Sequence, residues 1–224
     1  MEFLWGAAIS AQQTEEHTTR DWNDWYRKKG SDQVKKNNLY RKFLYKDSWR
    51  SDEVGSQLSN PKSYKQNATK IMHEENYESD YEMLEEIGLN SLRFSIPWSK
   101  VQPSIDEFDS EAINHYKNRI LSLRNRNVEP ILTLWHFDQP SWFSDMGGWH
   151  SEDAHLIFGE YVEKIVDELG DLVNIWTPLN EPNGWIYGSY VFNKFPPDNT
   201  KRRYTFRAYR NIVQSQRAAY DIIK

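Results

Sequence analysis

The stretch PILTLWHFD at residues 130–138 decides the fold, because an apolar run ends there abruptly in polar side chains. A short apolar run without alternation is typical of a strand that is buried on both faces of a parallel sheet. A helix is expected next at 152–169, where apolar residues recur at helical spacing, with Ser151 as its candidate N-cap and Gly170 as its candidate C′ residue. Together these segments predict one parallel strand–helix unit.

Three more units of the same kind can be read along the chain. Their strands are expected at 3–9, 91–96 and 173–179, and their helices at 77–87, 110–127 and 205–223. Four alternating units fit either a (β/α)8 barrel or an open doubly wound sheet. No G-x-G-x-x-G loop follows any of these strands, so dinucleotide binding has no support.

Composition excludes several classes of site and partner. The 28 basic and 33 acidic residues give a net charge of −5, which does not indicate nucleic acid or an anionic membrane as a partner. The lack of cysteine excludes disulfides, thiolate zinc sites and thiol nucleophiles. The N-terminus lacks the basic region of a signal peptide and no segment is long enough to span a bilayer, so a cytoplasmic location is expected by default.

Two local features of the composition have simple interpretations. Residues 27–70 hold twelve Lys or Arg against four Asp or Glu, with little apolar periodicity, which predicts a long loop after the first strand with a solvated basic surface. Aromatic residues make up 15% of the chain, with ten Trp, and many lie near segment ends. Such rings stack on sugars or fill cores, and composition alone favours the core.

Polar and aromatic residues gather just after the carboxyl end of each predicted strand. They are Gln12-Gln13, Pro97-Trp98, His136-Phe137-Asp138 and Asn180-Glu181. A barrel places its active site at this end of its strands. Glycoside hydrolysis uses two carboxyl groups, and an apolar strand end would raise the pKa of Glu181 and suit it as the acid. On composition alone, however, Glu-Pro-Asn-Gly is more typical of a turn.

Four blocks of the sequence resemble a single known family. The blocks are FLWGAAISAQQTEE (3–16), DYEMLEEIGLNSLRFSIPWSKVQP (80–103), PILTLWHFDQPSWFSDMGGW (130–149) and WTPLNEPNGWIYGSY (176–190). In this order and spacing they resemble the N-terminal half of family 1 glycoside hydrolases, which are retaining β-glucosidases and β-galactosidases on a (β/α)8 barrel. The resemblance implies an α/β fold in which residues 1–224 form the N-terminal (βα)4 half of a TIM barrel, as one incomplete catalytic domain of a glycoside hydrolase.

The resemblance also implies roles for five residues. Glu181 matches the general acid/base after the fourth strand, and Asn180 matches the residue that hydrogen-bonds the sugar 2-hydroxyl. Gln13 matches the glutamine that binds the outer hydroxyls of the glycone, and His136 matches the histidine that binds the 3-hydroxyl. Arg93 matches the arginine beneath the site that interacts with the nucleophilic carboxylate. The resemblance implies no cofactor and no metal.

Three positions depart from the family pattern. Gln12 stands where the family usually has an aromatic residue, and Phe137 stands where it has Trp. Loss of the indole N–H removes a polar contact to the sugar, which leaves the glycone preference open. Pro178 replaces a common Thr inside the fourth strand, and because proline has no N–H we expect a local break in strand pairing there.

The partner carboxylate of this chemistry is not found in the sequence. The family's nucleophile is a glutamate in a T-E-N-G-like block after the seventh strand, and no such block occurs here. Four units also cannot close a barrel, and the first and fourth strands would remain as edges. We therefore expect the chain to be inactive alone on a β-glycoside or oligosaccharide substrate, and to need the missing C-terminal half of the barrel or a second chain. The alternatives are a saccharide-binding or scaffolding half-barrel without catalysis, and another barrel glycosidase that shares Asn-Glu-Pro.

Overall fold

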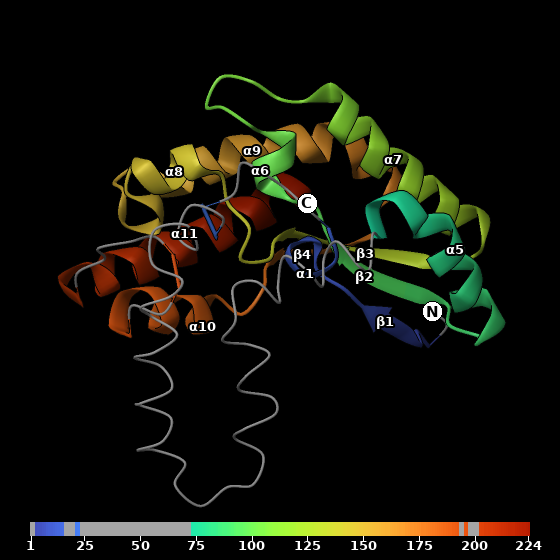
Figure 1. Cartoon of the computed structure of the whole chain (residues 1–224). Helices are drawn as coiled ribbons and strands as arrows, with labels where there is room; N and C mark the ends of the chain where they lie inside the picture. The colour runs from blue at the N-terminus through green and yellow to red at the C-terminus, as the bar shows by residue number, and fades with distance from the viewer. Residues whose placement is uncertain (1–2, 16–20, 23–72, 193–194, 197–201) are drawn as a thin grey trace, which may run out of the picture.

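Four parallel strands form one sheet in a computed structural model that describes residues 3–15, 21–22, 73–192, 195–196 and 202–224 (Figure 1). The loop expected at 27–70 lies outside these described residues. The strands are β1 (Gly6–Ala8), β2 (Ser91–Ser95), β3 (Glu129–Trp135) and β4 (Ile175–Leu179).

The strands lie side by side in the order β1-β2-β3-β4, which is their order along the chain. In register, Ala8 pairs with Arg93, Arg93 with Ile131, and Ile131 with Ile175. A doubly wound sheet reverses its strand order at a switch point, whereas a barrel does not. The observed order therefore supports the barrel alternative.

Every helix expected from the apolar spacing is present. Figure 1 shows α5, α7 and α9 on the same side of the sheet, as the outer helices of a barrel lie. The described helical segments are α1 (Ala11–Thr14), α5 (His73–Glu86), α6 (Trp98–Val101), α7 (Ser110–Asn125), α8 (Ser141–Asp145), η1 (Gly148–His150), α9 (Ala154–Leu169), η2 (Gly170–Leu172), α10 (Pro182–Ile186), η3 (Tyr187–Val191), η4 (Arg202–Tyr204) and α11 (Thr205–Ile223). Among the described residues, no helix is long and apolar enough to cross a membrane.

The predicted caps of α9 are wrong. The N-cap is Asp153, and the carbonyl of Ser151 instead accepts a hydrogen bond from Asn211 Nδ2 at 2.6 Å. Gly170 has a helical φ of −57° rather than a left-handed one, because the chain continues directly into the 3₁₀ turn η2. The Asn211 hydrogen bond thus ties α11 to the chain just before α9.

The outer strands are shorter and less buried than expected for strands covered on both faces. Most residues of β2 and β3 are buried, whereas β1 is mostly exposed and β4 is half-buried along most of its length. Phe3 and Trp5, which belong to the predicted first strand but precede β1, are 69% and 65% exposed. Within the described part of the chain, no further strand pairs with the free sides of β1 and β4. These are the open edges that four βα units predict.

Pro178 interrupts the pairing of β3 with β4, as its chemistry predicts. The register pairs Thr133 with Thr177 and Trp135 with Leu179, and the position between them, Pro178, has no partner in the register. Proline cannot donate to a ladder, so the strand loses a backbone hydrogen bond just before the residues of the candidate site.

Large aromatic side chains fill the core between the sheet and the helices. Trp98, Trp135, Trp149 and Trp185 are all fully buried. Trp98 also stacks on Tyr161, with ring centroids 5.0 Å apart and an interplanar angle of 23°. For these rings the core interpretation of the aromatic content is confirmed.

Candidate active site

Asn180 and Glu181 lie where β4 leaves the sheet. The Asn180 N–H donates to the carbonyl of Trp135 at 2.9 Å, so the chain stays attached to β3 for one residue beyond the strand. Glu181 then has φ 40° and ψ 51°, a left-handed backbone conformation that residues other than glycine rarely adopt. Pro182 begins α10 directly after it. Strained backbone of this kind is concentrated at functional sites and ligand contacts.

Arg93 connects the end of β4 to the middle of the sheet. Its Nη2 donates to Asn180 Oδ1 at 2.7 Å, and its Nε donates to Thr133 Oγ1 at 2.9 Å. A guanidinium only donates, so the Asn180 amide must turn its oxygen toward Arg93 and keep its N–H groups for another partner. Burial lowers the pKa of Arg93 from its ordinary value, and the negative charge of Glu181 opposes that shift. The three residues therefore form one electrostatically connected group.

His136 lies at the corresponding end of β3 and is held neutral. Burial, followed by the positive charge of Arg93, lowers its pKa to about 4. Its Nδ1 is buried and has no hydrogen-bond partner among the described residues. The next residue, Phe137, has a left-handed φ of 64°, so strained backbone follows β3 as it follows β4. A neutral imidazole has one donor and one acceptor nitrogen, a pairing that suits a hydroxyl group.

Replacing Arg93 with Met is expected to raise the pKa of His136, because it removes the neighbouring positive charge. In the native protein, the unfolded state binds the proton of His136 between pH 6.5 and about 4, while the folded state does not. Stability therefore falls as the pH drops through this window. The measurement is an NMR titration of the His136 ring protons in both proteins. An unchanged His136 titration in Arg93→Met would contradict the electrostatic link.

Gln13 shares this edge of the sheet but not the contacts of the other four residues. It lies in α1, at the carboxyl end of β1, and its Oε1 accepts a hydrogen bond from Ser10 Oγ at 2.9 Å. The Gln13 side chain is exposed. The structure thus brings Arg93, His136, Asn180 and Glu181 into one connected group, and places Gln13 on the same rim without a described contact to them.

The expected burial of Glu181 is wrong. The residue is exposed, although Asn180 before it is buried. One reason is that residue 184 is a glycine. A Cβ at this position would lie 3.6 Å from Glu181 Oε2, so a larger residue there would cover part of the carboxylate, and glycine leaves it open. Among the described residues, the strand end therefore does not bury Glu181 as expected.

Sequence reasoning missed a buried acid beside the His136 turn. Asp21 Oδ2 accepts from Ser144 Oγ at 2.7 Å, and Ser144 Oγ in turn accepts from Gln139 Nε2 at 2.8 Å. Burial raises the pKa of Asp21 well above its ordinary value, against the lowering effect of the Ser144 hydrogen bond, and the charge of Asp138 adds to the rise. The adjacent Trp22 donates from Nε1 to the carbonyl of Phe137 at 2.7 Å. No spacing in the sequence joins residues so far apart.

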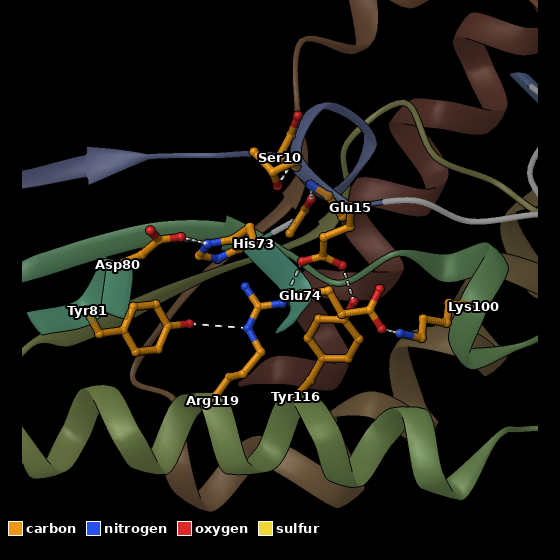
Figure 2. Close-up of polar contacts among 12 residues, drawn as sticks. Ser10, Glu15, His73, Glu74, Asp80, Tyr81, Lys100, Tyr116 and Arg119 are labelled. Carbon is orange, nitrogen blue, oxygen red and sulfur yellow. Dashed lines mark hydrogen bonds and ion pairs between the residues drawn. The ribbon is translucent and has the colours of Figure 1, made fainter. Parts of the chain in front are cut away.

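A second missed group is a buried ion pair behind α1. Arg119 of α7 donates to Glu15, which also accepts from Tyr116 (Figure 2). Glu15 belongs to the block that carries Gln13, but nothing in the sequence indicates its partner. Among the described residues, no group of three or more His, Asp or Glu side chains is arranged to hold a metal ion.

Comparisons with known sequences relate the chain to glycosidases. The sequence model of glycosyl hydrolase family 1 matches residues 45–224. Beta-glucosidase A of Acetivibrio thermocellus is 38% identical over 111 residues, which are 49% of this chain and 25% of that protein. The cytosolic beta-glucosidase of Homo sapiens is 35% identical over 123 residues, which are 54% of this chain and 26% of that protein.

Solved structures agree with the fold. A beta-glycosidase from Pyrococcus horikoshii matches with a TM-score of 0.72 and 25% identity, over 98% of this chain and 44% of that one. A beta-glucosidase from Thermotoga maritima in complex with deoxynojirimycin matches with a TM-score of 0.78 and 21% identity, over 99% of this chain and 45% of that one. The chain therefore matches about a quarter of these curated relatives and less than half of these solved chains, and its α/β fold is part of a TIM barrel.

Proposed function

This chain belongs to glycosyl hydrolase family 1, and from that premise we propose that it is the acid/base-bearing portion of a retaining β-glycosidase. The observation that carries the proposal is the contact of Arg93 with Asn180 directly before Glu181, at the carboxyl edge of a parallel sheet. The proposed substrate is a β-linked glycoside or oligosaccharide, in keeping with the beta-glucosidases that it resembles. A cytoplasmic location is part of the proposal, supported by the likeness to a cytosolic beta-glucosidase.

Glu181 is the general acid/base in this proposal. In a retaining glycosidase one carboxyl group protonates the leaving oxygen while the second attacks the sugar carbon, and the first then takes a proton from the incoming water. Glu181 would donate its proton to the glycosidic oxygen and, as a carboxylate, would later accept a proton from water. Its exposure leaves it accessible to both the leaving group and the water.

Three neighbouring residues are proposed to bind the sugar. Asn180 turns its oxygen to Arg93, so its amide N–H groups are available to the 2-hydroxyl oxygen. The neutral imidazole of His136 is suited to the 3-hydroxyl, and Gln13 on the same rim is suited to the outer hydroxyls of the glycone. These contacts would orient the sugar so that its glycosidic oxygen faces Glu181.

The nucleophile is proposed to come from outside this sequence. Retention requires two carboxyl groups about 5–5.5 Å apart. The sequence has no T-E-N-G-like block, and the free sides of β1 and β4 in the described structure are suited to pairing with further strands. The remaining βα units of the barrel, or a second chain, would both close the sheet and supply the partner carboxylate.

The purified 224-residue chain is expected to show no turnover of an aryl β-glucoside, because it lacks the second carboxyl group. Co-expression with a polypeptide that carries the remaining βα units and the T-E-N-G glutamate should restore turnover. The measurement is the release of the aryl alcohol by both preparations at equal concentration. The control is the same polypeptide with its T-E-N-G glutamate changed to glutamine.

Robust hydrolysis by the chain alone would contradict the proposed division of the site. Saccharide binding without turnover in both preparations would favour the alternative, a non-catalytic saccharide-binding or scaffolding half-barrel.

A further inference from the structure

Gln13 lies on a segment that cannot hold its own shape. Its helix α1 is a single turn of four residues, and isolated helices of this length are unstable in water. The preceding strand β1 has only three residues and lies at an exposed edge. The position of Gln13 therefore depends on contacts that α1 makes with the rest of the fold.

The strongest of the described contacts is made by Glu15, directly after α1. Arg119 Nη1 donates to Glu15 Oε1 at 2.5 Å, and the Tyr116 hydroxyl donates to Glu15 Oε2 at 2.5 Å. Glu15 is 2% exposed, and Tyr116 and Arg119 are fully buried. Figure 2 shows Tyr116 and Arg119 rising from one helix toward the carboxylate. Both oxygens of Glu15 are thus held by α7, a helix far away in the sequence.

Arg119 is itself held in place from several sides. Its Nε donates to the hydroxyl of Tyr81 on α5 at 3.2 Å, and its guanidinium carbon lies 5.1 Å from the centre of the Phe94 ring on β2. Burial lowers the pKa of Arg119, but the charge and hydrogen bond of Glu15, together with Tyr81 and Tyr116, outweigh that effect, and the net pKa is raised above its ordinary value. Arg119 is therefore a permanently charged point fixed by α5, β2 and α7.

We propose that Glu15, Tyr116 and Arg119 are positioning residues that hold α1, and with it Gln13, at the carboxyl edge of the sheet. The link to Gln13 is short: Ser10 Oγ donates to Gln13 Oε1, and the Ala11 N–H donates to Ser95 Oγ at 2.9 Å. The role of Gln13 in sugar binding rests on the proposed function, but the anchoring of α1 does not. Recognition of the glycone at this rim thereby depends on a buried charge pair behind it.

Hydrogen exchange in this chain, complemented with the remaining βα units, tests the anchor. The amides of Thr14 and Glu15 donate to the carbonyls of Ser10 and Ala11, so their exchange reports opening of α1. Tyr116→Phe removes one hydrogen bond to a buried carboxylate and keeps the ring. The expected result is roughly ten- to hundredfold faster exchange at Thr14 and Glu15, the range given by a hydrogen bond to a charged group.

Tyr161→Phe is the matched control. Tyr161 is also fully buried, and its hydroxyl donates to the carbonyl of Leu134 in β3 at 2.9 Å. This variant should speed exchange in β3 and leave Thr14 and Glu15 unchanged, because opening of α1 does not break the Tyr161 hydrogen bond. Unchanged α1 exchange in Tyr116→Phe would overturn the proposal, and so would equal acceleration of α1 by both variants.

A separate variant distinguishes failure of the anchor from failure of the proposed function. Gln13→Ala in the same complemented preparation should raise the KM for an aryl β-glucoside. If the KM is unchanged while Tyr116→Phe still opens α1, the sugar-binding role of Gln13 is wrong and the anchor stands. If Gln13→Ala raises the KM but Tyr116→Phe leaves the exchange rates of the α1 amides unchanged, the proposed anchoring of α1 is wrong and the proposed function stands.

Discussion

In this chain complemented with the remaining βα units, Glu181→Gln is expected to lower kcat/KM for an alkyl β-glucoside by about 10²–10⁴-fold, the usual contribution of a general acid or base. An alkoxide is a poor leaving group, so the first step needs the proton that Glu181 would supply. The amide of glutamine keeps the size of the side chain but can neither donate that proton nor take one from water. The measurement is glucose release from the alkyl glucoside by the native enzyme and the variant.

Two comparisons separate this role from general damage to the fold. Glu163→Gln changes an exposed glutamate on α9 in the same way and should leave the rate unchanged. The dinitrophenolate group of a dinitrophenyl glucoside leaves without protonation, so the variant's first step should be nearly normal on that substrate. On the same substrate, added azide attacks the glycosyl-enzyme without help from a base. Azide should therefore raise the turnover of Glu181→Gln but not that of the native enzyme. Full activity of Glu181→Gln on the alkyl glucoside would show that Glu181 is not the general acid/base.

The parts of this site that the sequence could predict are those set by local rules. Parallel strands carry their carboxyl ends to one edge, so His136 and Asn180 could be placed together before their contacts were known. The break at Pro178 follows from the missing N–H of proline, and the register confirms it. The resemblance to family 1 glycoside hydrolases, which the family match confirms, then gave these positions their expected roles.

The parts that could not be predicted depend on side chains far apart in the chain. Whether Glu181 is buried is decided by what surrounds it in space, including the missing side chain of Gly184, and not by the apolar strand before it. The pairing of Glu15 with Arg119 joins residues more than a hundred positions apart. A long-range ion pair leaves no periodic pattern in the sequence, so helical spacing could mark the apolar face of α7 but not the buried charge on it.

That buried charge gives the largest expected effect on stability. Arg119→Met should lower the free energy of unfolding by about 3–5 kcal/mol, because it leaves the carboxylate of Glu15 buried without its counter-charge. For a chain of this size the loss corresponds to a fall in Tm of roughly 10 °C. The measurement is urea unfolding followed by circular dichroism, with a thermal scan on the same samples.

The double variant Glu15→Leu, Arg119→Met shows whether the cost comes from the unpaired charge or from lost packing. Replacing both members of a buried pair with apolar residues of similar size is often neutral, so the double variant should regain most of the stability that Arg119→Met loses. Arg124→Met is the control, because its ion pair with Glu129 is partly exposed and should contribute at most about 1 kcal/mol. If Arg119→Met lost no more stability than Arg124→Met, Glu15 would not be a buried charge. If the double variant were as unstable as the single one, packing around the guanidinium, and not its charge, would hold α7 to the sheet.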